Sequence, residues 1–443
     1  MDLSRILGQI NDLFTLYLIF PAMLLLGLYL SFKLRFIQFT RLKESFKQLL
    51  TKRESGNGIS HYQAVAAVLA GNFGTGNIAG MAIALATGGP GALVWMWVIA
   101  FLGATVQFAS CVLGVKYREK NSKGEPVGGP MYYLSRGLGK RKLATLFALF
   151  ALFAGLTAGN LTQVNSIALP LAKLGISPLF SGVGIAILVG IVLLGGIQRF
   201  AKVAASVVPI MAALYFGTAL VILGLHTDLI LPAMKQIFVA AFSPTSFAGG
   251  VMGFGLMRAV STGFDRGIFA TDAGTGIAPI LQSSTESDDP ITNGLVTLVA
   301  PVLVMAVCMT TGLVLLVTGA WQSGLQSTNM VTAAFSQGLG TPMGGGIVIL
   351  ALFLFSYTTI LAWANCGERA VGYLLGEEWI QRYRWFFIAI VPVGAFCNVH
   401  LVWLLADISF SLMLLTNMIG VAGLSKEVIR DSNAVLFPKK IPG

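Results

Sequence analysis

The chain has 443 residues, of which 56% are hydrophobic and only 11% are charged, and its mean hydropathy is +0.80. A soluble domain needs about a quarter of its residues charged to cover its surface. This composition excludes a soluble fold and indicates an outer surface that faces lipid. Backbone polar groups in hydrocarbon need partners within the protein, and apolar runs of about 20 residues satisfy them as helices. The sequence therefore predicts an all-α polytopic membrane protein.

The formal net charge is +11, from 29 basic and 18 acidic residues. In a soluble protein such an excess would suggest nucleic acid as a partner, but here the basic residues collect in short loops between apolar segments. We expect the lipid bilayer as the partner and no nucleic acid. The four cysteines lie in apolar segments without metal-binding spacing, which is typical of buried thiols that pack the interior.

Apolar windows predict about eleven transmembrane helices. Their expected ranges are 13–33, 62–86, 91–116, 143–172, 180–198, 203–225, 248–281, 291–319, 344–375, 385–400 and 402–424. The first lacks a preceding basic region and a small-residue cleavage site, so we interpret it as an uncleaved helix and not as a signal peptide. No long hydrophilic stretch interrupts the series, and we expect a single membrane domain over residues 1–443.

The basic residues predict the orientation of these helices. If the helices alternate across the bilayer, the loops on one face hold 23 of the 29 basic residues. These segments are 33–61, 116–142, 199–202, 376–384 and the tail after residue 424. Cytoplasmic loops carry the excess of Lys and Arg, so the N-terminus is expected outside and the C-terminus in the cytoplasm. Short loops of this kind are typical of a bacterial inner-membrane protein.

A repeat is visible at an offset of 200 residues. Gly74-Thr75-Gly76 matches Gly274-Thr275-Gly276, and Pro90 matches Pro290. Five helices separate the two copies, and an odd number means that the second copy crosses the membrane in the opposite direction. The spacing predicts an inverted five-plus-five repeat with one extra N-terminal helix. The expected parts are 13–33 for the extra helix, 62–225 for the first repeat and 248–424 for the second.

Each Gly-Thr-Gly segment interrupts an apolar helix. Glycine costs about 1 kcal/mol against alanine within a helix, and unwound backbone in lipid costs several more, so such a stretch must line a polar cavity. Unwinding exposes amide donors at the start of one half-helix and carbonyl acceptors at the end of the other. Asn77 and Asp272 flank the two breaks. The pattern favours a pocket that holds a carboxylate and a cation together, over glycines that only allow close packing.

Several blocks of sequence, spread over nearly the whole chain, carry a family resemblance. They are Gly74-Thr75-Gly76-Asn77-Ile78-Ala79-Gly80, Gly88-Gly89-Pro90-Gly91-Ala92 with Trp95-Met96-Trp97, Gly128-Gly129-Pro130-Met131-Tyr132-Tyr133, Gly159-Asn160 with Gln163, Asn165 and Ser166, Gly195-Gly196-Ile197 with Arg199, and Trp363 with Gly367-Glu368-Arg369. Together they resemble the alanine or glycine:cation symporter family. The resemblance implies the fold of the bacterial leucine transporter and uptake of small neutral amino acids with sodium.

The second break departs from the family pattern. The family usually reads Ser-Asn-Glu-Ala-Gly-Met-Gly-Ser-Ala-Pro, whereas residues 270–279 read Ala-Thr-Asp-Ala-Gly-Thr-Gly-Ile-Ala-Pro. The acid is shorter at Asp272, and Thr275 replaces a methionine. These changes bear on the size of the preferred substrate and leave its class unchanged.

The resemblance also implies which residues bind the amino acid. The carboxylate would meet the amides around Thr75, Gly76 and Asn77, with Gln163 reaching in from a neighbouring helix. The ammonium would face oxygens of the second break, where Asp272 lies. Three further residues are expected to bound the side-chain pocket, namely Thr359, Trp363 and, less directly, Phe269.

Sodium needs several oxygen ligands, which carbonyls freed by a helix break and nearby hydroxyls supply. By analogy with the fold, we expect one ion between the carbonyls of Ala70 and Phe73 and the hydroxyls of Thr358 and Thr359. No cofactor is expected beyond this coupling ion.

Ionisable residues within membrane helices are candidates for function. Arg258, Asp265 and Arg266 are close in sequence and favour pairing among themselves, and Asp407 is expected near the outer interface.

The leading interpretation is a sodium-coupled symporter of alanine or glycine. One alternative replaces sodium by a proton carried on Asp272, and another takes glutamine as the substrate. A channel is disfavoured because two helix breaks indicate an enclosed pocket. An enzyme is disfavoured because the three histidines are scattered and no nucleophile has a matched base.

Overall fold

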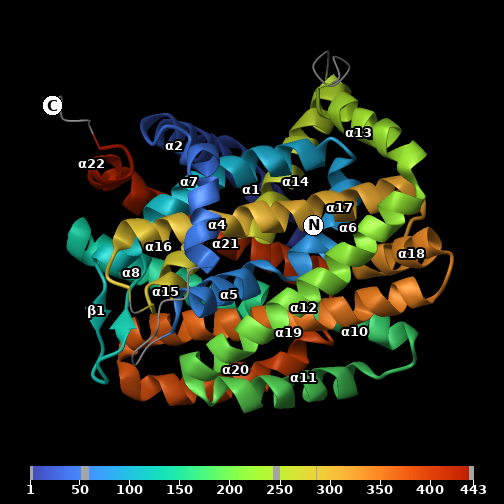
Figure 1. The fold of residues 1–443 in the computed structure, drawn as a ribbon. Helices are drawn as coiled ribbons and strands as arrows, with labels where there is room; N and C mark the ends of the chain where they lie inside the picture. The colour runs from blue at the N-terminus through green and yellow to red at the C-terminus, as the bar shows by residue number, and fades with distance from the viewer. Residues whose placement is uncertain (1–2, 51–58, 243–249, 286, 439–443) are drawn as a thin grey trace.

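A computed structural model describes residues 3–50, 59–242, 250–285 and 287–438, and nearly all of the described chain is helical (Figure 1). The only paired strands in these ranges form a hairpin of β1 (Glu119–Lys120) and β2 (Pro126–Val127). The all-α class expected from composition is therefore confirmed. The helices lie side by side in a bundle, with α12 (Gly196–Leu225) packed on α19 (Met343–Leu375) and α11 (Pro178–Leu193) on α20 (Ile380–Gly394) (Figure 1).

The N-terminal helix is longer than expected. α1 (Leu3–Phe14) continues through a π-helical turn, η1 (Thr15–Ile19), into α2 (Phe20–Lys33), whereas the sequence predicted a start at residue 13. Polar residues in the first two turns hide this extension from a hydropathy window. Two short helices follow in the stretch expected to be a loop, namely α3 (Ile37–Thr40) and α4 (Leu42–Leu50).

The region expected to form the first repeat begins with an interrupted helix. Its elements are α5 (His61–Asn72), η2 (Thr75–Asn77), α6 (Ala79–Gly88), α7 (Ala92–Lys116), α8 (Pro130–Tyr132), η3 (Tyr133–Gly137), α9 (Arg141–Leu156), η4 (Thr157–Leu161), α10 (Thr162–Lys173), α11 (Pro178–Leu193) and α12 (Gly196–Leu225). η4 is a π-helical turn within the helix expected at 143–172, and the composition of its five residues does not predict a π-helical turn.

The region expected to form the second repeat also begins with an interrupted helix. Its elements are α14 (Gly250–Thr271), α15 (Ile277–Gln282), α16 (Pro290–Thr297), α17 (Val299–Val317), η6 (Ala320–Gln322), α18 (Ser327–Leu339), α19 (Met343–Leu375), η7 (Glu377–Trp379), α20 (Ile380–Gly394) and α21 (Val399–Gly423). The helix expected to end at residue 400 ends at Gly394, because α21 begins only after an Asn398 cap that accepts from the Leu401 amide.

Three further helices were not predicted. They are α13 (Thr227–Phe242), which joins the two regions, α18, and α22 (Ser425–Leu436) near the C-terminus. Each has 12 to 16 residues and carries polar or charged side chains among its apolar ones, so a search for apolar windows does not detect it.

Seven helices among the described residues are long and apolar enough to cross a membrane. They are Ile6–Lys33, Ala92–Lys116, Arg141–Lys173, Gly196–Leu225, Pro290–Val317, Met343–Leu375 and Val399–Gly423. Of the other four expected spans, two are the interrupted helices at the start of each region. The remaining two correspond to α11 and α20, which have 16 and 15 residues. The count of eleven and the inverted repeat stay predictions.

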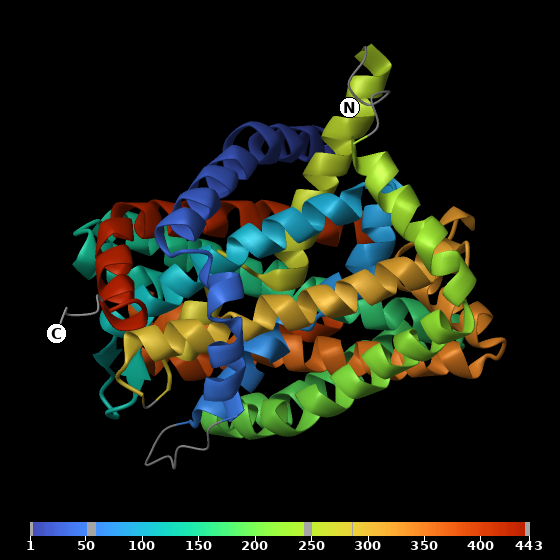
Figure 2. The same ribbon diagram turned by 45° about the horizontal axis from the view of Figure 1, so that its top comes forward.

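The loops rich in basic residues share one end of the bundle, here called the basic face (Figures 1 and 2). Lys116 at the end of α7 forms ion pairs with Glu427 and Asp431 of α22. The Ser122 amide in the hairpin donates to Glu377 Oε1 at 2.9 Å. These contacts tie the hairpin, the loop after α19 and the C-terminal helix together.

Candidate functional site

The first helix break lies between Asn72 and Ala79. Gly74 is fully extended, with φ −113° and ψ −164°, so α5 cannot continue into α6. Asn77 closes the gap, because its Nδ2 donates to the carbonyls of Asn72 at 2.7 Å and Gly74 at 3.3 Å. The Cys308 thiol of α17 donates to Asn77 Oδ1 at 3.1 Å. The break predicted from Gly-Thr-Gly is therefore confirmed.

The second break lies between Thr271 and Ile277. Asp272, Gly274 and Gly276 adopt positive φ values of 49°, 84° and 99°. Glycine meets no steric penalty in that region of φ, and Asp is among the few other residues that enter it. The Thr275 hydroxyl donates to the Asp272 carbonyl at 2.7 Å, and Asn417 Nδ2 of α21 donates to the Gly274 carbonyl at 2.7 Å. This break is also confirmed.

The two breaks lie against each other. A Cβ atom on Gly76 would lie 2.8 Å from Phe269 Cδ1, 2.9 Å from the Phe269 carbonyl oxygen and 3.0 Å from Ala270 Cα. Two of these three atoms belong to the backbone and cannot rotate away. Gly76 is therefore required by close approach, and it brings the start of α6 against the end of α14.

Gln163 bridges the first break to α10. Its Oε1 accepts from the Thr75 amide at 3.1 Å, and its Nε2 donates to the Ala158 carbonyl at 2.9 Å. Ala158 lies in the π-helical turn η4, which leaves main-chain groups without their usual helical partner. The turn thus fixes the orientation of a buried amide whose oxygen and nitrogen both have partners.

Four buried side-chain polar atoms at the breaks make no hydrogen bond to any described residue. They are Oδ1 and Nδ2 of Asn72 and Oγ1 of Thr75 at the first break, and Oδ2 of Asp272 at the second, all on buried residues. An unsatisfied buried polar group costs about 1–3 kcal/mol, and more for a charged group. A hydroxyl donor at one break and a carboxylate at the other suit a ligand that carries an anionic and a cationic group close together.

An aromatic layer covers one side of the breaks. Trp363 of α19 stacks on Phe410 of α21 at 5.3 Å between ring centroids, and Phe269 of α14 contacts Phe410 at 5.1 Å and Trp403 at 4.6 Å. A Cβ on Gly159 would lie 2.3 Å from Trp363 Cβ, so the glycine allows α19 to approach η4. Trp363 and Phe269, both expected to bound a side-chain pocket, thus pack against the same residue, Phe410.

Three oxygens converge beside the first break. The Thr359 hydroxyl donates to the carbonyls of Ala70 at 2.8 Å and Phe73 at 3.1 Å. The Thr358 hydroxyl instead donates to the Leu354 and Phe355 carbonyls of its own helix, both at 3.0 Å. Of the four expected sodium ligands, the structure joins Ala70, Phe73 and Thr359 directly, and it places Thr358 on the adjacent position of α19.

The expected site residues are all buried in this conformation. Their exposures are 0% for Ala70, Thr75, Asn77 and Thr358, 1% for Thr359 and Trp363, 2% for Phe73, Gln163 and Asp272, and 5% for Phe269. A cavity of about 1,200 Å³ opens on the basic face, lined in part by Lys116, Arg118, Ser284 and Arg369. Arg118 donates to the Thr285 carbonyl at 2.7 Å, which holds the loop after α15 between this cavity and the breaks.

One expected ion pairing is wrong. Arg266 pairs with Asp407 of α21 and not with Asp265, and Arg258 is exposed. The Arg266 guanidinium also lies over the Trp403 ring, 4.7 Å from its centroid. Local pairing was expected because Arg258, Asp265 and Arg266 lie one to eight residues apart on one helix. Packing of α14 against α21 instead brings Asp407, which is far away in the sequence, next to Arg266.

Sequence reasoning missed several residues that build the site. Cys308, Phe410 and Asn417 each lie far along the chain from the residue they contact. Asn417 carries a weak signal, because a buried amide in an apolar helix needs partners. A thiol or a phenylalanine in such a helix carries none.

A buried site between two interrupted helices, in a bundle of long apolar helices, defines a membrane transporter. The fold is similar to that of MhsT, solved in complex with L-phenylalanine, with a TM-score of 0.59 and 14% identity over 86% of this chain and 93% of that one. This agrees with the leucine-transporter type of fold. The chain belongs to the sodium:alanine symporter family, whose model matches residues 1–436. It is a transporter and not an enzyme.

Relatives with assigned names cover almost the whole chain. The sodium/alanine symporter AgcS of Methanococcus maripaludis is 37% identical, over 98% of this chain and 97% of its own. A probable sodium/glutamine symporter, GlnT, of Bacillus subtilis is 34% identical over 96% and 89%. A putative sodium/proton-dependent alanine carrier, YrbD, of the same organism is 34% identical over 92% and 87%.

Proposed function

We propose that this protein carries a small neutral amino acid, alanine or glycine, into the cell together with sodium by alternating access. The observation that carries the proposal is the contact between the two breaks at Gly76, with an unpartnered buried hydroxyl at the first break and an unpartnered buried carboxylate oxygen at the second. The name of AgcS supports sodium and alanine, and the name of GlnT supports sodium. The basic face supports a cytoplasmic C-terminus in a bacterial inner membrane.

In the proposed binding mode, the substrate carboxylate receives hydrogen bonds from Thr75 Oγ1 and the Gly76 amide. The Asn77 amide joins them by leaving the Gly74 carbonyl, to which it donates at 3.2 Å here. These groups lie in η2, directly before α6, where the dipole of the helix favours an anion. Gln163 holds the Thr75 amide and orients the segment. The ammonium lies against Asp272 and the carbonyls at the end of α14, where the dipole favours a cation.

Sodium is proposed to bind at the Ala70 and Phe73 carbonyls with the Thr359 hydroxyl. The Thr358 hydroxyl is the fourth proposed ligand, because donating to its own helix leaves its oxygen lone pairs free. Uncharged oxygens suit a monovalent ion that must leave again during each cycle.

Alternating access needs a closure on each side of the site. On the side away from the basic face, we assign the Arg266–Asp407 ion pair and the aromatic layer, which join α14 to α21. On the basic face, we assign Arg118, which joins α7 to the loop after α15 and also pairs with Asp288.

A proton-coupled mechanism is the second candidate. Asp272 favours it, because an ionised carboxylate at a buried site needs a proton, a cation or an ammonium group to offset its charge. Proton coupling differs from sodium coupling in the ion that drives uptake. Transport of glutamine in place of alanine would differ only in the contacts of the substrate's side chain.

Uptake of labelled L-alanine into proteoliposomes separates these candidates. We expect accumulation under an inward sodium gradient with equal pH on both sides, and no accumulation when choline replaces sodium. Uptake driven by a pH gradient and indifferent to sodium would refute sodium coupling. Competition by glycine, serine and glutamine then ranks the substrates.

Replacing Trp363 by Phe should enlarge the side-chain pocket. We expect valine and leucine to compete with labelled alanine several-fold better than in the wild type, because the smaller ring releases volume beside Gly159 and Phe410. Trp385→Phe is the matched control, since Trp385 on α20 is 57% exposed and faces away from the site. An unchanged competition profile in Trp363→Phe would contradict the placement of this wall.

A further inference from the structure

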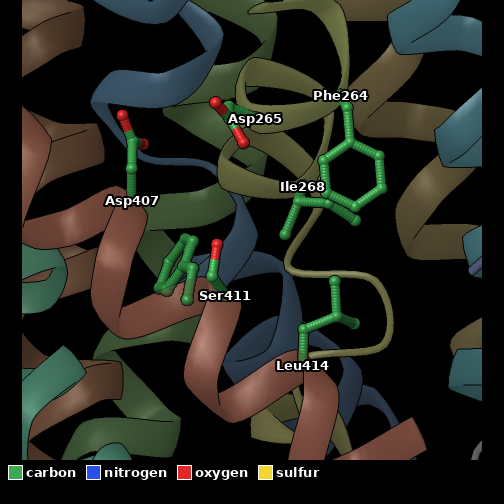
Figure 3. A pocket seen from close by; sticks show the side chains of 7 residues that line it. Phe264, Asp265, Ile268, Asp407, Ser411 and Leu414 are labelled. Carbon is green, nitrogen blue, oxygen red and sulfur yellow. The ribbon is translucent and has the colours of Figure 1, made fainter. Parts of the chain in front are cut away.

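A small polar cavity lies between α14 and α21, one to two helical turns from the second break. It is lined by Phe264, Asp265, Ile268, Asp407, Phe410, Ser411 and Leu414, and its volume is about 10 Å³ (Figure 3). A cavity needs roughly 10–15 Å³ by this measure to hold one water molecule. The space therefore suits a single water-sized particle or a bare monovalent ion.

The cavity carries more negative than positive charge. Arg266 forms an ion pair with Asp407, and no described residue forms an ion pair with Asp265. Asp12 of α1 is a third carboxylate, and it interacts electrostatically with Asp265. Asp12 also interacts with two cations, Arg266 and Arg258. One carboxylate is left without a compensating charge, in a setting where uncompensated charge is costly.

Two oxygen atoms that line this space also lack a partner. Ser411 is only 5% exposed and makes no hydrogen bond to any described residue, and its hydroxyl points toward the side on which Asp265 lies (Figure 3). Asp407 Oδ1 likewise has no hydrogen-bond partner in the described part of the chain. The polar side chains of the lining are thus two carboxylates and a hydroxyl, all oxygen groups of the kind that hard cations prefer.

We propose that this cavity is a second sodium site, formed by Asp265, Asp407 Oδ1 and the Ser411 hydroxyl and separate from the site at Thr359. A monovalent ion fits better than a divalent one, because no three His, Cys, Asp or Glu side chains of the described residues converge to hold a metal. One sodium ion offsets the single uncompensated carboxylate. The identity of the ion rests on the proposed sodium coupling.

Binding of ²²Na⁺ to purified full-length protein, without any amino acid, tests this site. Asp265→Asn and Thr359→Ala are each expected to lose one bound sodium ion per molecule, and the double variant both. Ser411→Ala retains the charges and should weaken the affinity for sodium at the cavity site about tenfold. That factor corresponds to the loss of one hydrogen bond to a charged group. Asp228→Asn, the same substitution at an exposed acid in the first turn of α13, should bind like the wild type.

The proposal is overturned if Asp265→Asn and Ser411→Ala both bind sodium with wild-type stoichiometry and affinity. Ser411→Ala keeps the test valid if Asp265→Asn does not fold. A wild-type protein that binds no sodium would instead refute the proposed coupling, so the two failures are distinguishable.

Discussion

Replacing Gly76 by Ala is expected to have the largest effect on transport. The new methyl group would lie 2.8 Å from the Phe269 ring and 2.9 Å from its carbonyl oxygen, so the two breaks must separate. Overpacking of this kind costs about 1–3 kcal/mol in an interior that can relax, and backbone neighbours relax poorly. We expect alanine uptake to fall by more than about tenfold at that cost, measured in proteoliposomes with equal amounts of protein.

Gly71→Ala provides the matched control one turn earlier in α5. Its methyl group would lie 3.5 Å from both Ala362 Cβ and Ile277 Cδ1, which is ordinary van der Waals contact. This variant should retain most of the wild-type uptake. Equal activity of the two variants would show that the contact between the breaks does not matter for transport.

Replacing Thr359 by Ala is expected to have the second largest effect. The change removes the only side-chain oxygen that contacts both the Ala70 and Phe73 carbonyls among the described residues. Losing one contact to a charged partner costs about 1.5–3 kcal/mol, so the sodium concentration for half-maximal alanine uptake should rise at least about tenfold. Uptake at saturating sodium should fall much less.

Two variants control for this substitution. Thr359→Ser keeps the hydroxyl and should restore the sodium dependence. Thr358→Ala removes a hydroxyl that faces its own helix, and we expect a smaller shift than for Thr359→Ala. If neither threonine variant changed the sodium dependence, sodium would have to bind elsewhere.

The interrupted helices were predictable because their signals are local. Two glycines close together, next to Asn77 or Asp272, destabilise an apolar helix at that position. Both segments unwind within a residue or two of the expected place. The convergence of Thr359 with Ala70 and Phe73 was expected by analogy with the fold that the family resemblance implies, and the break signal alone does not predict it.

Other features depend on contacts that a single sequence does not encode. The π-helical turn η4 that orients Gln163 has ordinary helix-forming neighbours, and Cys308 reaches Asn77 from 231 positions away. Arg266 selects Asp407 over Asp265 because of how α14 packs on α21. α13 and α18 were not predicted because polar side chains interrupt their apolar runs.

An experimentally determined structure of the protein with L-alanine and sodium bound tests the central claim most directly. The account predicts density for the amino acid between residues 74–77 and 269–272, with its carboxylate at the start of α6 and its ammonium toward Asp272. Amino-acid density outside this gap, with residues 74–77 and 269–272 in mutual contact as they are here, would contradict it.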